Sequence, residues 1–386
     1  MKKITLLAFL LYAYANCLQA QLPKYDHVII IMEENWSYAQ TIGGTNAPTL
    51  TALSKTAYTA NFTQSYGNTH PSEPNYLELF SGTLHGVTTD IVGPASNAPF
   101  NDCNMGSSLI SAGYTFIGYA ESQPSAGWYS GNTGNYYTKH CPWINWTGPK
   151  ATADSIPINS NLPFSSFPDS NHYTNLPTVC WVIPNIVDDM HNPALSTTAI
   201  KNGDAWFKTN IMPLVRWAVN HNTLVITTWD EDDNAHGNNI ATLFSGANIK
   251  GGNYATPKFT HFGVLRTIED MYSLPICDSS STENDITGVW NITTSIPTEP
   301  MFTNDLSIWP VPAKNQLNMT ITLSSAEKVR VSISDITGRQ IKEQNLDLKT
   351  GNNPVNFSID NFANGIYFVS INSIGFNSCK KVIVQN

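Results

Sequence analysis

One stretch of the chain combines a serine with the pattern of a helix start, where a phosphate group could bind. It begins with a polar turn at Thr69, reaches Ser72 and Pro74, continues as an apolar-rich run and ends at Gly82. Serine near the N-cap, proline in the first turn and glycine after the last turn are typical of a helix. The free N–H groups at a helix N-terminus attract oxyanions. Ser72 is therefore a candidate nucleophile, although a serine that only caps the helix would leave the same pattern.

Acidic, amide and histidine side chains follow the apolar runs of the chain and could bind a metal ion. These residues are Glu33, Glu34, Asn35, Asp188, Asp189, His191, Asp230, Glu231, Asp232, Asp233 and, before a later amphipathic segment, His261. Carboxylates are unfavourable to crowd together unless a cation lies among them. Oxygen-rich ligand sets suit hard or borderline divalent metals. Any one of these carboxylates could be a solvated loop residue, but their recurrence after several runs predicts a divalent metal site.

The apolar runs have the length and composition of strands that are buried on both faces. They are His27–Met32, Tyr114–Tyr119, Thr178–Ile183 and Thr223–Thr228. Segments with helical patterns alternate with them, namely Pro48–Thr56, Asn75–Phe80, Ser107–Ala112, Asp204–Asn220 with a break at Pro213, and Val264–Tyr272. This alternation predicts an α/β domain with a mainly parallel sheet flanked by helices. Such sheets bind ligands at the carboxyl ends of their strands, so we expect the polar residues there to share one site.

Composition and charge narrow the class of protein. The chain has 386 residues, of which 41% are hydrophobic and 13% charged, as expected for a folded chain of two or three domains. Its formal net charge is −9, but residues 21–304 alone carry 10 basic and 23 acidic residues, a net charge of −13. An acidic main body gives no support for nucleic-acid binding. It does permit a cluster of carboxylates around a metal ion.

The N-terminal segment reads as a secretory signal peptide, residues 1–20. It has a basic start at Lys2 and Lys3, an apolar run from Ile4 to Ala15, and a small residue, Ala20, before the expected cleavage point. The apolar run is shorter than the roughly 20 residues that a membrane anchor needs. We therefore expect export with signal removal and no transmembrane segment afterwards.

Four cysteines remain in the main body after signal removal, namely Cys103, Cys141, Cys180 and Cys277. In an oxidising compartment they can form two disulfides, with three possible pairings that the sequence leaves open. Their scattered spacing matches no zinc-binding template. Cys379 lies alone in the tail.

The tail has a different pattern from the main body. After a linker at residues 298–305, short alternating strands occupy residues 306–386. Lys328–Asp335 is one strand, the segment Thr337–Arg339 forms a turn, and a partner strand begins at Gln340. Further strands are expected at residues 355–359, 365–371 and 379–384. About 80 residues with this pattern predict a small β-sandwich.

The main body, from about Tyr25 to Pro275, resembles the phosphoesterase family that includes bacterial and fungal acid phosphatases and phosphocholine-type phospholipases C. The matching segments, in order, are His27–Asn35, Trp36–Tyr38, His70–Tyr76, Ser81–Gly82, Tyr119–Ser122, Lys139–Pro142, Leu176–Thr178, Pro184–Asn185, Asp189–His191, Gly203–Trp206, Trp229–Glu231, His261 and Leu265–Glu269. The resemblance implies an alkaline-phosphatase-like fold for residues 21–297.

The resemblance also implies roles for individual residues. Ser72 would be the nucleophile and would form a phosphoserine intermediate. One divalent ion would be held by Glu34, Asn35, Asp230 and Glu231. His191 or His261 would protonate the leaving oxygen, and a second ion could bind at Asp189, His191 and His261. Phosphate or leaving-group contacts would come from His70, Asn75, Lys139 and His140, for each of which loop hydrogen bonding is an equally good interpretation.

The tail resembles the C-terminal sorting domain of type IX secretion cargo. The segments that carry the resemblance are Ile308–Ala313, Asp335–Gly338, Gly365–Phe368 and Lys380–Gln385. This implies recognition by the type IX machinery, passage through the periplasm and the outer membrane, and then surface attachment or release. The alternative, a carbohydrate-binding sandwich, is disfavoured because no aromatic platform stands out.

These observations predict a secreted, metal-dependent phosphoesterase that acts on a small-molecule phosphate ester. An acid-phosphatase-like phosphomonoester hydrolase is the first interpretation. A phosphodiesterase or phospholipase C is the alternative within the family, and an inactive surface binding protein of the same fold is the alternative outside enzymes.

Overall fold

A computed structural model describes residues 22–148, 154–291, 305–323, 326–373 and 377–385. The expected signal peptide and most of the expected linker, residues 298–304, lie outside the described residues. The chain divides into two compact units, Met1–Ile292 and Thr293–Asn386. Each unit is described by itself.

The first unit is built on a nine-stranded sheet. In spatial order its strands are β4 (Asn161–Pro163), β3 (Phe116–Ala120), β5 (Val179–Ile183), β1 (His27–Glu33), β6 (Thr223–Trp229), β7 (Asn239–Gly246), β2 (Thr59–Tyr66) and β8 (Gly252–Tyr254), and β9 (Phe259–Thr260) pairs with β2. The strands from β4 to β6 are mutually parallel, whereas β7 is antiparallel to both β6 and β2. The predicted mainly parallel sheet is therefore confirmed.

Strand β1 lies near the centre of this sheet, and its apolar side chains are buried on both faces. Val28 and Ile30 belong to one hydrophobic core, and Ile29 and Ile31 belong to the other. Alternate side chains of a strand point to opposite faces, so a run of consecutive aliphatic residues requires a cover on each side. The sequence pattern and the position of the strand thus have the same cause.

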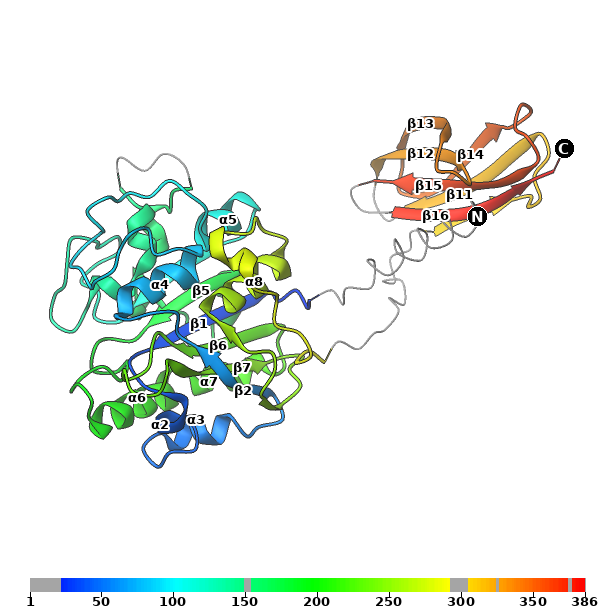
Figure 1. Ribbon diagram of the computed structural model, residues 1–386. Helices are drawn as coiled ribbons and strands as arrows, with labels where there is room; N and C mark the ends of the chain where they lie inside the picture. Colours follow the sequence, from blue (N-terminus) through cyan, green and yellow to red (C-terminus); the bar gives the residue numbers. More distant parts are fainter. Residues whose placement is uncertain (1–21, 149–153, 292–304, 324–325, 374–376, 386) are drawn as a thin grey trace, which may run out of the picture. The chain divides into compact units, whose positions relative to one another are not determined.

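Helices provide the two covers (Figure 1). On one face lie α4 (Ser72–Ser81), α5 (Met105–Ser111) and α8 (His261–Tyr272), and on the other lie α2 (Tyr38–Thr41), α3 (Pro48–Leu53), α6 (Thr197–Asn210) and α7 (Met212–Ala218). Short 3₁₀ helices are η1 (Thr138–His140), η2 (Pro142–Trp146), η3 (Ile158–Ser160), η4 (Phe164–Ser166), η5 (Tyr173–Asn175) and η6 (Asp278–Thr282).

The ends of several helices differ from the expected ranges, and two of these differences have a clear physical reason. Helix α4 begins at Ser72 rather than Asn75, because Pro74 fits the first turn, and it ends at Gly82, whose φ of 78° is left-handed. The segment expected to break at Pro213 forms α6 and α7, which meet at Ile211 with Pro213 in the first turn of α7. A proline is tolerated there because the first-turn N–H groups have no intrahelical acceptor.

Only one of the two possible disulfides forms in the first unit. It joins Cys103 before α5 to Cys277 after α8, with an α-carbon separation of 5.3 Å. Cys141 and Cys180 are separate, buried thiols, and Cys379 is an exposed thiol. The disulfide ties two helices of the same face together.

The second unit consists of two antiparallel sheets around its own core. One sheet has the order β10 (Asp305–Trp309), β11 (Gln316–Leu323), β14 (Gly351–Ser358), and the other has β13 (Gln340–Leu348), β12 (Glu327–Asp335), β15 (Gly365–Asn372), β16 (Asn377–Val384). The inward residues of both sheets, including Leu317, Val331 and Val369, form one buried cluster. The predicted β-sandwich is confirmed, as is the hairpin of β12 and β13.

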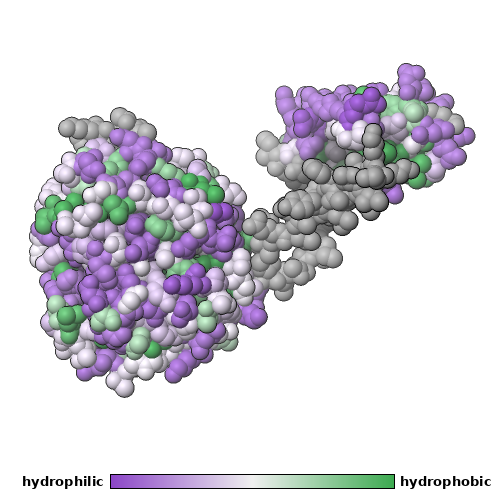
Figure 2. Space-filling model, viewed as in Figure 1, coloured by the Kyte–Doolittle hydropathy of each residue, from purple (hydrophilic) through white to green (hydrophobic). Residues whose placement is uncertain are grey.

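The surface gives no sign of a broad apolar patch on the face shown in Figure 2, where hydrophobic residues of the first unit are scattered among hydrophilic ones. No helix in the described ranges is long and apolar enough to cross a membrane.

Candidate active site

The site lies where three adjacent parallel strands, β5, β1 and β6, end at the same edge of the sheet. Backbone hydrogen bonds continue between the segments that follow these strands. The Glu34 N–H donates to the Asp189 carbonyl at 2.8 Å, and the Asp230 N–H donates to the Glu33 carbonyl at 3.0 Å. These bonds hold Glu34, Asp189 and Asp230 side by side. The expectation that polar residues after the apolar runs share one location rests on this strand order, and the structure brings them together.

Ser72 is the first residue of α4 and lies at the centre of these carboxylates. Its Oγ is 3.1 Å from Glu34 Oε2 and 3.2 Å from Glu231 Oε1. Lys139 Nζ lies 3.3 Å from the same oxygen. One hydroxyl can donate to only one carboxylate at a time. The buried serine is therefore next to a proton acceptor and a fixed positive charge.

The carboxylates around Ser72 are more numerous than the protein's own charges can balance. Asp230 Oδ1 accepts from the Asn35 N–H at 3.0 Å, but its Oδ2 is buried without a partner among the described residues. Burial, together with Glu34 and Glu231, raises the pKa of Asp230 well above its ordinary value. Burial and Glu34 raise the pKa of Glu231 to about 8. A buried oxygen without a donor, in a group of acids, is the environment that a divalent cation fits.

Asn35 lies beside these carboxylates, with its side-chain amide nitrogen directed at Glu231 and Ser72. It follows Glu34 in a left-handed conformation with φ of 57°, which asparagine tolerates better than most residues. Its Nδ2 lies 3.1 Å from Glu231 Oε1 and 3.5 Å from Ser72 Oγ. The amide therefore faces the same space as the carboxylates.

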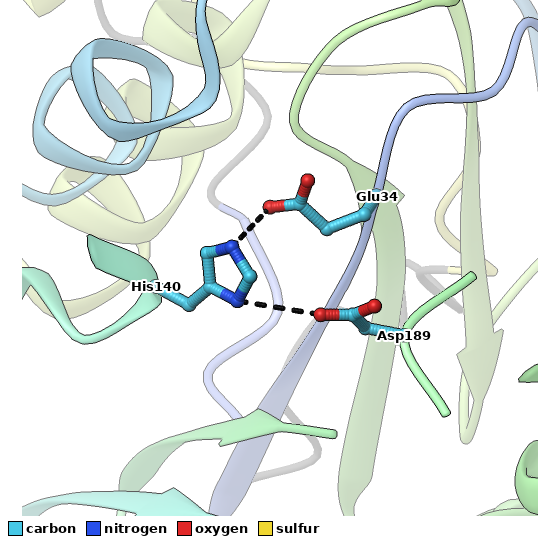
Figure 3. A group of neighbouring side chains, drawn as sticks. All are labelled: Glu34, His140 and Asp189. Carbon is cyan, nitrogen blue, oxygen red and sulfur yellow. Dashed lines mark ion pairs between the residues drawn. The ribbon is translucent and has the colours of Figure 1, made fainter. Parts of the chain in front are cut away.

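His140 lies between two carboxylates rather than at the surface of a substrate pocket (Figure 3). Its Nε2 is 2.8 Å from Glu34 Oε1 and its Nδ1 is 3.3 Å from Asp189 Oδ2. Although burial alone would lower the pKa of His140, these carboxylates raise it to about 9. The ligand atoms of the three residues also lie close enough to hold a metal ion. His140, predicted as a substrate contact, is instead a buried partner of Glu34.

Lys139 is anchored by a loop residue that the sequence did not single out. Its Nζ is 2.7 Å from Asp90 Oδ2, in addition to its contact with Ser72. Although burial alone would lower the pKa of Lys139, Glu34 and Asp90 raise it above its ordinary value. The ammonium group is therefore charged and directed at the Ser72 hydroxyl.

The residues expected to form a second metal site are not brought together. His261 is buried at the start of α8, its Nε2 lies 2.7 Å from the Asp230 carbonyl oxygen, and burial lowers its pKa to about 4. It is thus a neutral imidazole that donates to the backbone behind Asp230. His191 donates its N–H to Asp189 Oδ1 at 2.8 Å, and its ring Nδ1 lies 3.1 Å from Asn192 Oδ1. His191 lines a cavity together with Lys139.

His70 and Asn75, the two remaining residues predicted to contact the phosphate or the leaving group, hydrogen-bond to protein groups around the site. His70 Nδ1 lies 2.5 Å from Glu231 Oε2 and its Nε2 lies 3.4 Å from Asp232 Oδ1. Asn75 accepts from the N–H groups of Asn68 and Thr69 and donates to two carbonyls of the same loop. All of its hydrogen-bonding capacity is used within the loop that precedes Ser72, so Asn75 shapes the site without contacting a ligand.

Sequence reasoning missed two residues that touch this arrangement. The Tyr76 hydroxyl donates to Glu34 Oε1 at 2.9 Å, and Asp90 anchors Lys139. Tyr76 lies one helical turn after Ser72, a spacing that places both on one side of the helix and could have indicated it. Asp90 lies in a long loop without periodicity, and nothing in the pattern indicated it.

Comparisons with known proteins identify the class of this site and then the family. The model of the phosphoesterase family matches residues 47–275, more than half of the chain. The protein is a hydrolase that acts on phosphoric ester bonds. The chain belongs to the phosphoesterase family.

Individual relatives agree with this assignment. Over 269 residues the chain is 39% identical to the phosphatidylinositol-3-phosphatase of Mycobacterium tuberculosis, covering 70% of this chain and 84% of that protein. It is 29% identical to an acid phosphatase of Aspergillus fumigatus, covering 55% of this chain and 48% of that protein, so it spans about half the fungal relative's length. An alkaline phosphatase superfamily protein of Vibrio parahaemolyticus matches with a TM-score of 0.45 and 12% identity over 86% of this chain and 82% of that one. Likeness at that level carries no conclusion.

The tail has its own match. A secretion system C-terminal sorting domain matches residues 307–385. This domain indicates export by type IX secretion to the cell surface or the outside, in agreement with the sequence prediction.

Proposed function

We propose that the protein is a metal-dependent phosphomonoester hydrolase in which Ser72 is the nucleophile. The observation that carries this proposal is the position of the Ser72 hydroxyl: it lies at the N-terminus of α4, between Glu34 and Glu231 and 3.3 Å from Lys139 Nζ. A serine hydroxyl is a weak nucleophile unless a base, a cation or both activate it. The intact set of acids around it argues against an inactive binding protein.

One divalent ion fits among Glu34, Asn35, Asp230 and Glu231. Bound there, it would supply positive charge that lowers the pKa of the serine hydroxyl and polarises the phosphoryl group. The unpartnered Asp230 Oδ2 and the raised carboxyl pKa values support this assignment. One ion rather than two is proposed because the His261 ring donates to the Asp230 carbonyl, and the His140 ring is paired with Glu34 and Asp189.

The protein's own residues account for the remaining steps. Ser72 Oγ transfers its proton to an adjacent carboxylate and attacks phosphorus, while the ester oxygen leaves on the opposite side. The free N–H groups of α4 and the ammonium of Lys139 stabilise the charge that develops on the phosphoryl oxygens. His191, beside Lys139, donates a proton to the leaving oxygen. Water then attacks the phosphorus of phosphoserine and loses a proton to the deprotonated His191, while the bond from phosphorus to Ser72 Oγ breaks, Oγ recovers its proton from the carboxylate, and phosphate is released.

His140 keeps Glu34 in its ionised form during this cycle. Although burial alone would raise the pKa of Glu34, His140 and Lys139 hold it well below the ordinary value. Glu34 can therefore bind a cation without first losing a proton. Asp189, on the far side of the imidazole, fixes its orientation.

A monoester suits this site better than a diester because a monoester dianion has more negative charge to be balanced. The phosphoryl side offers a metal position, the Lys139 ammonium and a helix N-terminus. Both relatives named above are phosphatases, which supports the same choice. A phosphodiesterase or phospholipase C is the alternative.

The test compares aryl phosphate monoesters with bis esters and with phosphatidylcholine, using purified protein with divalent metals added singly. We expect kcat/KM for the monoester to be at least about 10-fold higher, which corresponds to about 1.4 kcal/mol in transition-state binding. The optimum should lie below pH 7, because a protonated general acid assists departure of the ester oxygen. A preference for diesters or phosphatidylcholine with an alkaline optimum would overturn the proposal, and full activity after exhaustive chelation would remove the metal.

A further inference from the structure

A cavity of about 340 Å³ opens beside the nucleophile and shares two residues with the site. These are Lys139, whose Nζ lies 3.3 Å from Ser72 Oγ, and His191. A group attached to the phosphorus attacked by Ser72 would extend past these side chains. The cavity is therefore in the position of a leaving-group pocket.

One part of the cavity is apolar. Ile91 and Val92 come from the loop between α4 and α5, and Tyr137 and Ile186 come from two other loops. Ile186 is almost fully buried, whereas Val92 is 69% exposed at the edge. Such a wall contacts hydrocarbon or an aromatic ring favourably and offers nothing to a charged group.

Two uncharged amides, Asn132 and Asn192, contribute to the polar lining. Asn132 is fixed because its Oδ1 accepts from the N–H and the hydroxyl of Thr138, at 2.8 and 2.9 Å. Asn192 Oδ1 lies 3.1 Å from His191 Nδ1. Each side chain keeps an NH₂ group that can donate to a hydroxyl or an ether oxygen. These groups recognise neutral polar atoms.

The cavity offers a second anionic group little positive charge beyond the proton that His191 donates to the leaving oxygen. Lys139 is the only lysine or arginine in the lining, and it is bound to Asp90 at 2.7 Å and directed at Ser72. The Asp90 carboxylate also lines the cavity and repels anions. With phosphate held by Lys139, a second anionic group would meet Asp90 and apolar side chains.

We propose that this cavity is the leaving-group pocket and that it selects esters of uncharged or cationic alcohols with an apolar flank over esters whose alcohol carries negative charge. The proposal rests on the proposed monoesterase function and adds the substrate class. Sugar bisphosphates and phosphorylated phospholipids, whose alcohols carry further phosphates, are thereby poor substrates.

Three aryl phosphates with similar leaving-group acidity test this proposal. They are 4-methylphenyl phosphate, 4-(2-aminoethyl)phenyl phosphate and 4-(carboxymethyl)phenyl phosphate, which carry neutral, cationic and anionic substituents. We expect kcat/KM for the anionic ester to be about 10-fold below that of the other two at low ionic strength, with a smaller difference at high salt. Equal or faster hydrolysis of the anionic ester would overturn the pocket assignment. If none of the three esters is hydrolysed, the monoesterase function itself is overturned.

Substitution of Val92 locates the effect in the cavity. Val92→Lys places a positive charge at the exposed edge, and Val92→Gln is a control of similar size without charge. We expect the lysine variant to raise kcat/KM for the anionic ester about fivefold relative to the glutamine variant, and to leave the neutral ester within about twofold. A lysine variant with the same anionic-to-neutral ratio as the glutamine variant would show that the leaving group does not occupy this cavity.

Discussion

The hydroxyl of Ser72, the proposed nucleophile, is buried among acids. Two carboxylate oxygens lie within 3.2 Å of its hydroxyl, so each could accept the proton, yet both would repel the resulting alkoxide. Lys139 provides one compensating charge. The divalent ion that we propose beside the unpartnered Asp230 Oδ2 would provide a second compensating charge.

Ser72→Ala tests the covalent route. We expect turnover to fall by about 10³-fold or more, because the residue that forms the phosphoenzyme is lost, while the thermal unfolding midpoint changes little. Ser281→Ala, at an exposed serine of the same unit, is the matched control and should keep full activity. Steady-state kinetics on an aryl monoester measure both variants. A Ser72→Ala enzyme that retains most of its activity would exclude Ser72 as the nucleophile.

Asp230→Asn separates metal binding from folding. We expect it to raise the stability of the metal-free protein and to reduce the extra stability that metal binding gives. Without metal, the variant should unfold at a higher temperature, since it removes a buried charge from the group that includes Glu34 and Glu231. With metal, the increase in unfolding temperature should shrink, since affinity falls by about 10-fold or more. Differential scanning calorimetry with and without divalent ions measures both, and exposed Asp26→Asn is the control. An undiminished metal-induced increase would contradict the ligand assignment.

The loop between α4 and α5 is joined to the first turn of α4 by reciprocal hydrogen bonds. The Glu73 N–H donates to Asp90 Oδ1 at 3.1 Å, and the Ile91 N–H donates to Glu73 Oε2 at 2.7 Å. Asp90 also binds Lys139. The first turn of α4, the loop and the Lys139 ammonium group therefore form one connected unit.

Two substitutions of Asp90 distinguish these connections. Asp90→Asn keeps an acceptor for the Glu73 N–H but loses the ion pair with Lys139, so we expect kcat to fall by about 10-fold with KM nearly unchanged. Asp90→Ala also removes the loop anchor and should raise KM as well. Michaelis–Menten kinetics of both variants give the comparison. If Asp90→Asn has the wild-type kcat, the ion pair does not position Lys139 for catalysis.

Helix α4 contains a buried acid that makes the stability of the first unit depend on pH. Glu78 has a buried Oε2 without a partner among the described side chains, and burial raises its pKa to about 7. The folded state therefore binds this proton more tightly than the unfolded state, whose pKa is near 4.5. Stability from this group is complete below about pH 4.5 and declines as the pH rises towards 7.

Glu78→Gln should remove this decline. The variant should match the wild type near pH 4.5 and exceed it above pH 7 by a few kcal/mol of unfolding free energy, because the neutral amide has no charge to bury. Urea denaturation at a series of pH values measures the difference, with exposed Asp26→Asn as control. Parallel wild-type and Glu78→Gln curves would show that Glu78 does not titrate in this range.

The elements that carry the site were predictable where burial determines the pattern. Strands β1, β5 and β6 are buried on both faces and appear as apolar runs, so the residues that follow them, Glu34 and Asp230 among them, could be predicted to meet. Strands β2 and β7 were not predicted, because polar residues such as those of the run Thr63–Ser65 interrupt their pattern. The positions of His140 and Asp90 depend on irregular loops, whose course no periodicity encodes.

The whole chain combines two units with separate cores. The first unit contains every residue of the candidate site, and the second has a core of its own between two antiparallel sheets. The sorting domain matches the second unit, and the phosphoesterase match lies within the first. Catalysis and export therefore depend on different parts of the chain.

A chain that ends at Asn304 tests this division. We expect the purified truncated protein to hydrolyse aryl monoesters with unchanged kcat/KM, because no site residue lies beyond that point and the first unit has its own two hydrophobic cores. In the native cell the same truncated protein should accumulate in the periplasm, because the segment that the secretion machinery recognises is absent. Cell fractionation with activity assays on each fraction measures both outcomes, and the full-length protein is the control. Surface display of the truncated chain at the full-length level would refute the sorting role, whereas a loss of activity in a folded truncated protein would show that the second unit contributes to catalysis.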